Sequence, residues 1–106
     1  MDGNEYQRLA ARTSGSLTKS QMMMNGILGL CGETGEVADQ IKKHLYQGHE
    51  LSREDLINEL GDVCWYIAQL ASSMGTDLNT VLEKNIEKLR LRYPDGFSVE
   101  RSLYRD

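Results

Sequence analysis

Two pairs of acidic residues, each spaced three positions apart, are the clearest sign of chemistry in the sequence: Glu33 with Glu36, and Glu59 with Asp62. Residues three apart on a helix project from one face, so each pair presents two carboxylates side by side. Each pair also flanks a stripe of apolar residues, and packing of the two stripes would bring four carboxylates to one edge of a groove. A single pair of this kind is most often only solvated surface charge. Two pairs facing each other would repel, and a hard divalent cation relieves that repulsion, so the spacing predicts a metal site.

Two further groups of polar residues are placed where they can border such a site. Tyr66 falls about one turn after Asp62, so its ring can form a wall beside the metal, or it is an amphipathic tyrosine at the edge of a bundle. Asn85, Lys88 and Arg92 share one strip of a later helical segment, beside its apolar face. This strip can contact a polyanion in the same groove, although basic strips on helices are commonly only solvated.

Hydrophobic periodicity predicts the helices that must position these residues. Apolar residues recur at helical spacing over 6–12, from about 20 to 46, from 53 to about 73 and from about 79 to 92. Four glycines inside the second segment each cost about 1 kcal/mol relative to alanine; they are Gly26, Gly29, Gly32 and Gly35. Gly26 and Gly29 lie on the acidic side of the helix, where close packing of helices and space for a substrate explain them equally well.

Capping and turn residues set the expected ends of these helices. Ser52 is expected to cap the third helix, because its hydroxyl can accept a first-turn backbone N–H, and Asn79 to cap the fourth. The fourth helix is expected to bury Leu78, Leu82, Ile86 and Leu89. It ends at Tyr93-Pro94, since proline cannot continue the helix. The tail from about 93 to 106 is predicted to be irregular.

Composition supports one small all-α domain spanning 1–106. The chain has 106 residues, 40% of them hydrophobic, which leaves no room for a second domain. One proline and one phenylalanine disfavour a strand-rich fold, so we predict a helical bundle of about four helices. The net charge of −4, with basic residues scattered among acidic ones, argues against nucleic acid as a partner. The sequence lacks a run of about 20 apolar residues and a secretion signal, so we expect no membrane partner and a cytoplasmic location.

The cysteines and the lone tryptophan bear on assembly. Cys31 and Cys64 fall inside apolar helical patterns and are expected to be buried thiols. With His44 and His49 they match no zinc-ligand spacing. Cys64 lies with Ile57 and Trp65 off the main apolar stripe of the third helix. A second apolar face of this kind predicts a homo-oligomer, with a single partly exposed tryptophan as the alternative.

The acidic pairs belong to an ordered set of motifs: Glu33-x-x-Glu36, Glu59-x-x-Asp62, Lys84-Asn85-x-x-Lys88 and Arg92-Tyr93-Pro94. In this order they resemble the MazG-type nucleoside triphosphate pyrophosphohydrolases of the all-α NTP pyrophosphatase superfamily, over nearly the whole chain. The resemblance implies a dimer or tetramer of helical bundles that binds Mg²⁺, with Mn²⁺ as a substitute. It also implies conversion of a nucleoside or deoxynucleoside triphosphate to the monophosphate and pyrophosphate, with a role in clearing unwanted nucleotides.

The resemblance also implies roles for particular residues. The metal ligands would be Glu33, Glu36, Glu59 and Asp62. Asn85, Lys88 and Arg92 would contact the nucleotide, and Tyr66 would form a wall of the site. Within this reaction we expect Glu36 to act on the attacking water and Lys88 to stabilise charge on the phosphates.

Two matters stay open in the sequence. Some relatives, including the dUTP-cleaving branch, have a glutamate directly before the first motif, where this chain has Gly32. The number of metal ions and the general base are therefore not fixed by the resemblance. A catalytically silent metal-binding interaction module is the alternative function. A di-iron carboxylate bundle is disfavoured, since neither His44 nor His49 follows a glutamate by three positions.

Overall fold

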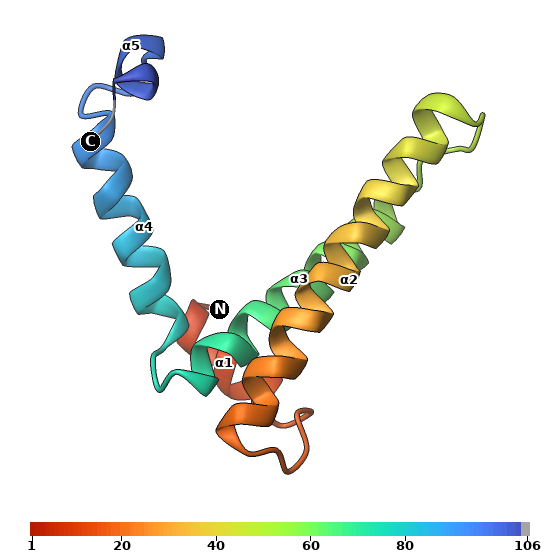
Figure 1. Cartoon of the computed structure of the whole chain (residues 1–106), viewed down its shortest axis with the longest axis vertical. Coiled ribbons are helices and arrows are strands. Elements are labelled where there is room, and N and C mark those ends of the chain that lie inside the picture. The colour runs from red at the N-terminus through yellow and green to blue at the C-terminus, as the bar shows by residue number, and fades with distance from the viewer. Residues whose placement is uncertain (105–106) are drawn as a thin grey trace.

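The computed structural model describes residues 1–104, and Figure 1 shows them as helices joined by short connections. The helices are α1 (Gly3–Ala11), α2 (Lys19–Tyr46), α3 (Arg53–Ser73), α4 (Leu78–Arg92) and α5 (Val99–Leu103). Between residues 1 and 104 there is no β-strand, which confirms the predicted all-α class. Within the same residues, no helix combines the length and the apolar character that a membrane span requires.

The helix starts follow from side-chain caps. Thr18 Oγ1 accepts the backbone N–H of Gln21 at 3.1 Å, and Gln21 Oε1 accepts the backbone N–H of Thr18 at 2.9 Å, so α2 opens with a complete capping box. Ser52 Oγ accepts the backbone N–H of Asp55 at 3.2 Å, which confirms the predicted cap of α3. These bonds satisfy backbone donors that the first helical turn leaves without intrahelical partners.

The predicted cap of α4 is wrong by two residues. Asp77 caps this helix, and its carboxylate accepts the backbone N–H of Thr80 at 2.7 Å. The pKa of Asp77 is lowered, first by a hydrogen bond with the side chain of Thr80 and then by the one from its backbone N–H. Asn79 lies inside the helix instead, and its backbone N–H donates to Asn4 Oδ1 at 2.9 Å. An ionised carboxylate is a stronger acceptor than a neutral amide, which favours capping by Asp77.

The observed helix boundaries also differ from the predicted ones near the two ends of the chain. The first helix begins at Gly3, three residues earlier than the apolar pattern predicts, because Asp2 caps it by accepting the backbone N–H of Glu5 at 2.9 Å. The tail is not irregular throughout: Ser98 caps α5 by accepting the backbone N–H of Arg101 at 3.3 Å. Residues 105 and 106, also predicted to be irregular, lie outside the described residues.

The helices form two arms that diverge from a common base (Figure 1). Helices α2 and α3 lie side by side along one arm, α1 packs at the base against α3 and α4, and α4 forms the second arm. The radius of gyration is 16.8 Å, whereas a compact domain of this length has about 13 Å. The chain is therefore more open than a self-contained bundle.

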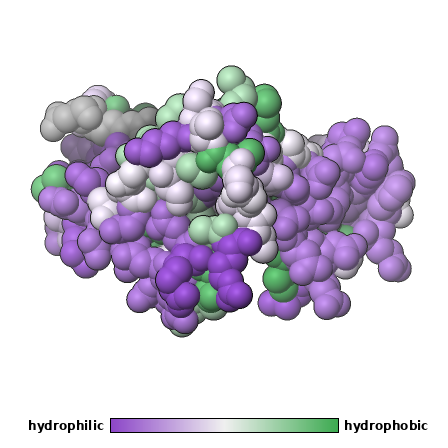
Figure 2. All heavy atoms as spheres, turned by 90° about the horizontal axis from the view of Figure 1, so that it is seen from below, coloured by the Kyte–Doolittle hydropathy of each residue, from purple (hydrophilic) through white to green (hydrophobic). Residues whose placement is uncertain are grey.

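Few hydrophobic side chains are buried in this open chain. Among residues 1–104, the buried hydrophobic residues are Ala68, Ala71 and Leu78. Of the face of α4 that was expected to be buried, Leu82 and Ile86 remain 51% and 47% exposed. That prediction is wrong for these two residues in a single chain, because within residues 1–104 α4 packs only at the base, against α1 and the end of α3. Figure 2 shows apolar patches among hydrophilic ones on the surface at the base.

The cysteines are also more exposed than predicted. Cys31 on α2 and Cys64 on α3 are both free and both exposed. Ile57 is 50% exposed, and Trp65 is partly exposed. His44 and His49 are exposed.

One side chain of α1, that of Gln7, forms hydrogen bonds with both arms. Gln7 Nε2 donates to Ser72 Oγ at 2.9 Å and to the carbonyl of Thr76 at 3.1 Å. Its amide oxygen accepts the backbone N–H of Leu78 at 2.7 Å. Between these partners the chain turns at Gly75, whose φ of 70° is the left-handed conformation that suits glycine. Gln7 thus bridges the end of α3 and the start of α4.

Candidate functional site

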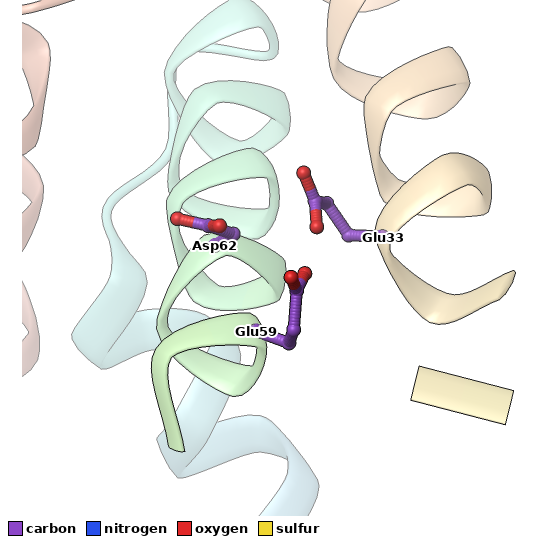
Figure 3. Close-up of side chains that lie close together, drawn as sticks. All are labelled: Glu33, Glu59 and Asp62. Carbon is purple, nitrogen blue, oxygen red and sulfur yellow. The ribbon is translucent and has the colours of Figure 1, made fainter. Parts of the chain in front are cut away.

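Three of the predicted acidic residues meet between α2 and α3. One carboxylate oxygen from each of Glu33, Glu59 and Asp62 lies within 4.8 Å of the others. Figure 3 shows Glu33 reaching from α2 toward Glu59 on α3, with Asp62 one turn further along α3. The two helices form the most extensive packing in the chain. The i, i+3 spacing on α3 therefore places two carboxylates toward the one from α2.

These three residues fit a divalent cation. Glu33 Oε2 and Glu59 Oε2 are shielded from solvent and have no hydrogen-bond partner among the described residues. A carboxylate oxygen without a donor is destabilised when it is removed from water. Three oxygen donors with net negative charge are ligands that hard cations such as Mg²⁺ prefer. The unpaired oxygens are thus explained if the three residues hold such an ion.

The electrostatics of Glu59 reflect this crowding. Its pKa is raised, first because the protonated carboxyl can share a hydrogen bond with Glu33, and then because of desolvation and the negative charges of Glu33 and Asp62. A hydrogen bond with the side chain of Glu36 acts in the opposite direction. The ionised form of Glu59 is therefore disfavoured beside its neighbours, and a proton or a cation relieves this.

Glu36 occupies a different position from the other three. It is exposed and is not among the residues whose oxygens lie within 4.8 Å of one another. It is close enough to interact with the side chain of Glu59. The structure thus brings three of the four acids together and leaves Glu36 at the rim of the cluster.

An aromatic pair stands beside the acids. Glu33, Asp62, Trp65 and Tyr66 line a hollow of about 360 Å³. The two rings are edge to face, with centroids 5.0 Å apart and an interplanar angle of 83°. Tyr66 lies where the sequence predicted a wall of the site. Trp65 was not predicted as a site residue, although its position three residues after Asp62 places it on a neighbouring part of the same helix face.

The glycines of α2 divide into two kinds. A Cβ at Gly26 would collide with Leu70, and one at Gly29 would collide with the ring of Tyr66. At Gly32 and Gly35 a Cβ would meet no atom within 4 Å from the described part of the chain. Close packing of α2 on α3 therefore explains the first two, whereas the other two face open space.

Tyr6 is a second neighbour of the cluster that the sequence did not indicate. Its hydroxyl donates to the carbonyl of Gly61 at 3.5 Å. Burial raises the pKa of Tyr6, and the neighbouring Cys64 and Asp62 raise it further. No local pattern signals this contact, because Tyr6 and Gly61 are 55 residues apart.

The basic strip of α4 lies apart from the acids in this chain. Figure 1 shows α4 on the opposite arm from α2 and α3, so Asn85, Lys88 and Arg92 do not share a groove with Glu33. Another hollow, of about 490 Å³, is lined by Lys84, Glu87, Lys88, Leu91, Arg92, Arg101 and Tyr104. Asn85 is exposed. A single chain thus separates the predicted metal ligands from the predicted phosphate contacts.

Comparison with known proteins gives two matches. A family model described as the MazG nucleotide pyrophosphohydrolase domain matches residues 21–97, a range that includes all four acids and the strip of α4. The "Gene 37 protein" of Mycobacterium phage L5 is 44% identical over 73 residues, which is 65% of this chain and 64% of that protein. The chain thus covers less than two thirds of that relative. No solved structure matches the chain.

Proposed function

Because this chain belongs to the MazG nucleotide pyrophosphohydrolase family, we propose that it hydrolyses a nucleoside or deoxynucleoside triphosphate to the monophosphate and pyrophosphate in a Mg²⁺-dependent reaction. The observation that carries the proposal is the cluster of Glu33, Glu59 and Asp62, which offers oxygens without hydrogen-bond donors inside the region that the family model covers. We place the reaction in the cytoplasm, where it would remove unwanted nucleotides.

The three clustered acids hold the metal in this proposal. When bound, Mg²⁺ neutralises phosphate oxygens and polarises the phosphorus–oxygen bond under attack, and Mn²⁺ can replace it. Glu33, Glu59 and Asp62 supply the negative charge that retains the ion. Glu36 joins them as a ligand or stays free at the rim, and its exposure favours the second role.

Glu36 is the residue that we assign to the attacking water molecule. A carboxylate that is not fully engaged by the metal can orient a water molecule and accept its proton as that water attacks phosphorus. Glu36 interacts with the side chain of Glu59, so it is adjacent to the cluster rather than part of it. Tyr66 closes one side of the same hollow and limits how the substrate can lie.

The remaining groups require a second copy of the chain. The exposed apolar residues of α4 and the radius of gyration of 16.8 Å support a homo-oligomer in which the arms of one chain pack against those of another. Asn85, Lys88 and Arg92 of one copy would then lie beside the acids of its partner. There the two cations offset the negative charge of the phosphates, and the amide donates or accepts a hydrogen bond.

The alternative is a catalytically silent metal-binding interaction module. The distance between the acids and the α4 strip in one chain favours it, because such a module needs the metal cluster but no phosphate contacts. Both functions predict metal binding, so binding alone does not separate them.

Release of pyrophosphate separates the two functions. The purified protein is incubated with a panel of ribo- and deoxyribonucleoside triphosphates in Mg²⁺, and pyrophosphate is measured. We expect release from at least one nucleotide, abolition by excess EDTA, and loss in the Asp62→Asn variant. No release from any nucleotide, by a protein that binds Mn²⁺, would establish the silent module.

A further inference from the structure

Trp65 shares a hollow with two of the acids, but no role in the proposed reaction has been given to it. The indole lines the hollow of about 360 Å³ together with Glu33, Asp62 and Tyr66. The acids at one side of this hollow attract a metal and, through it, phosphates. The other side is formed by two aromatic rings. A nucleotide is built in the same way, since its phosphates suit the acidic, metal-binding side of the hollow and its flat base suits the aromatic side.

The orientation of Trp65 is fixed by a residue of the connection after α1. Trp65 Nε1 donates to Thr13 Oγ1 at 2.8 Å. The Thr13 hydroxyl donates in turn to the carbonyl of Ala10 at 2.8 Å, so its lone pairs are directed toward the indole. The one polar group of the indole is thereby satisfied by the protein, so the part of the ring that lines the hollow can make apolar and stacking contacts.

The second ring supports the first. The rings of Trp65 and Tyr66 meet edge to face with their centroids 5.0 Å apart, an arrangement that aromatic pairs favour. Tyr66 is itself seated against Gly29, where no side chain competes for space. Each ring is therefore held by a partner outside the pair, Trp65 by Thr13 and Tyr66 by α2.

From this arrangement we infer that the base of the nucleotide stacks on Trp65, and that Thr13 is a positioning residue for that contact. The inference rests on the proposed function. Stacking on an aromatic ring accepts any base, since every base has a π face. Trp65 therefore contributes affinity for any base. The hydrogen bond to Thr13 fixes the orientation of the indole plane on which the base stacks.

Trp65 is the only tryptophan in the chain, so its fluorescence reports on this contact directly. The protein in Mg²⁺ is titrated, at fixed protein concentration, with deoxynucleoside monophosphates and separately with inorganic pyrophosphate. The monophosphates carry a base and have no anhydride to cleave, whereas pyrophosphate carries no base. We expect saturable quenching by the monophosphates and none by pyrophosphate.

Two variants of Thr13 test the positioning role. Thr13→Val keeps the shape but removes the hydrogen bond, and we expect KM for the preferred triphosphate to rise about fivefold to tenfold with kcat nearly unchanged. Thr13→Ser keeps the hydroxyl and should restore the KM of the unmodified protein. Trp65→Leu should raise KM further than Trp65→Phe, because phenylalanine retains a stacking surface.

The outcomes separate this inference from the function on which it rests. Pyrophosphate release that persists while the monophosphates leave the emission unchanged would overturn the role of Trp65 and leave the hydrolase intact. Emission that changes with protein dilution but not with monophosphate would also overturn it, because Trp65 would then belong to the surface between copies. A KM unaffected by Thr13→Val would overturn the positioning role.

Discussion

The ring of Tyr66 on α3 occupies the space above Gly29 on α2 where any other residue would place its Cβ. This contact, with that of Leu70 against Gly26, lets the two helices approach closely along the stretch that precedes the metal cluster. The distance between Glu33 and the acids of α3 therefore depends on a residue that has no side chain.

Gly29→Ala should disturb the site. The added methyl group forces Tyr66 to move, and overpacking of this kind costs about 1–3 kcal/mol of stability. Gly32→Ala is the matched control, because its Cβ would meet no described atom within 4 Å, and it should gain up to about 1 kcal/mol from helix propensity. Urea denaturation followed by circular dichroism measures both, and equal stability of the two variants would show that Tyr66 adapts without cost.

The acids should divide into two classes when they are replaced one at a time. Glu33→Gln, Glu59→Gln and Asp62→Asn remove clustered ligands and should weaken Mn²⁺ binding, measured by calorimetry, at least tenfold. Glu36→Gln should retain most of the binding but lose pyrophosphate release, because this residue lies at the rim. Loss of binding in Glu36→Gln equal to that in the other variants would make Glu36 a ligand and leave the base unassigned.

Metal binding should depend on pH through Glu59. Its pKa is raised in the folded, metal-free protein, chiefly by the hydrogen bond that the protonated form shares with Glu33. Protons then compete with the metal, so Mg²⁺ affinity rises as pH increases through the folded pKa of Glu59, and binding releases protons. Calorimetry in buffers of different ionisation enthalpy measures this release, and Glu59→Gln should reduce it.

The same shift has a consequence for stability. An acid with a raised pKa disfavours its charged form in the folded state, so the stabilisation present at low pH is lost as pH rises through the folded pKa. We expect the metal-free protein to lose stability as the pH rises from the ordinary pKa of a glutamate to the raised pKa of folded Glu59, and to regain it on addition of Mg²⁺. Thermal melts with and without Mg²⁺ over a pH series provide the measurement.

The apolar face of α4 should be required for assembly. Leu82→Glu places a charge on the face expected to contact a second copy, and sedimentation should show a shift toward monomer. Leu91→Glu is the control, because Leu91 lies on the opposite side of the helix and is 76% exposed. An unmodified protein that sediments as a monomer at all working concentrations would contradict the proposed oligomer.

Complementation tests whether acids and cations come from different copies. Lys88→Ala should weaken the transition state by about 2–3 kcal/mol if the lysine contacts phosphate directly, and Asn85→Ala should mainly raise KM. Mixing Asp62→Asn with the impaired Lys88→Ala should raise activity well above that of either variant alone. In a symmetric dimer, random exchange gives about one intact site in four. Mixtures that stay inactive after verified subunit exchange would place both groups in the same copy.

Much of the fold followed from local patterns in the sequence. The long helix ends at Tyr46 and the third at Ser73, as the spacing of apolar residues and the glycines at 48 and 75 predicted. Ser52 caps its helix as expected. The sequence predicted that α2 and α3 pack together, and they form the most extensive helix pair of the chain, with Glu33 close to Glu59.

The errors concern contacts that the local pattern does not encode. Leu82 was expected to be buried but is 51% exposed, and the strip at Lys88, expected to border the acids, lies on the other arm of the same chain. The hydrogen bonds of Gln7 direct α4 away instead, and the residues that fix this direction are more than 60 positions apart. Hydrophobic periodicity identifies the apolar face of a helix. It does not tell whether the same chain or a second copy packs against that face.

The bridge made by Gln7 also sets an order of events during synthesis. Its partners at Ser72 and Leu78 follow it by 65 and 71 residues, so α1 leaves the ribosome long before it can be fastened. Helices α2 and α3 are neighbours in the chain and can pair first, since closing a short loop costs less entropy than closing a long one. We therefore expect the direction of α4 to be fixed last, after the cluster of acids between α2 and α3 has formed.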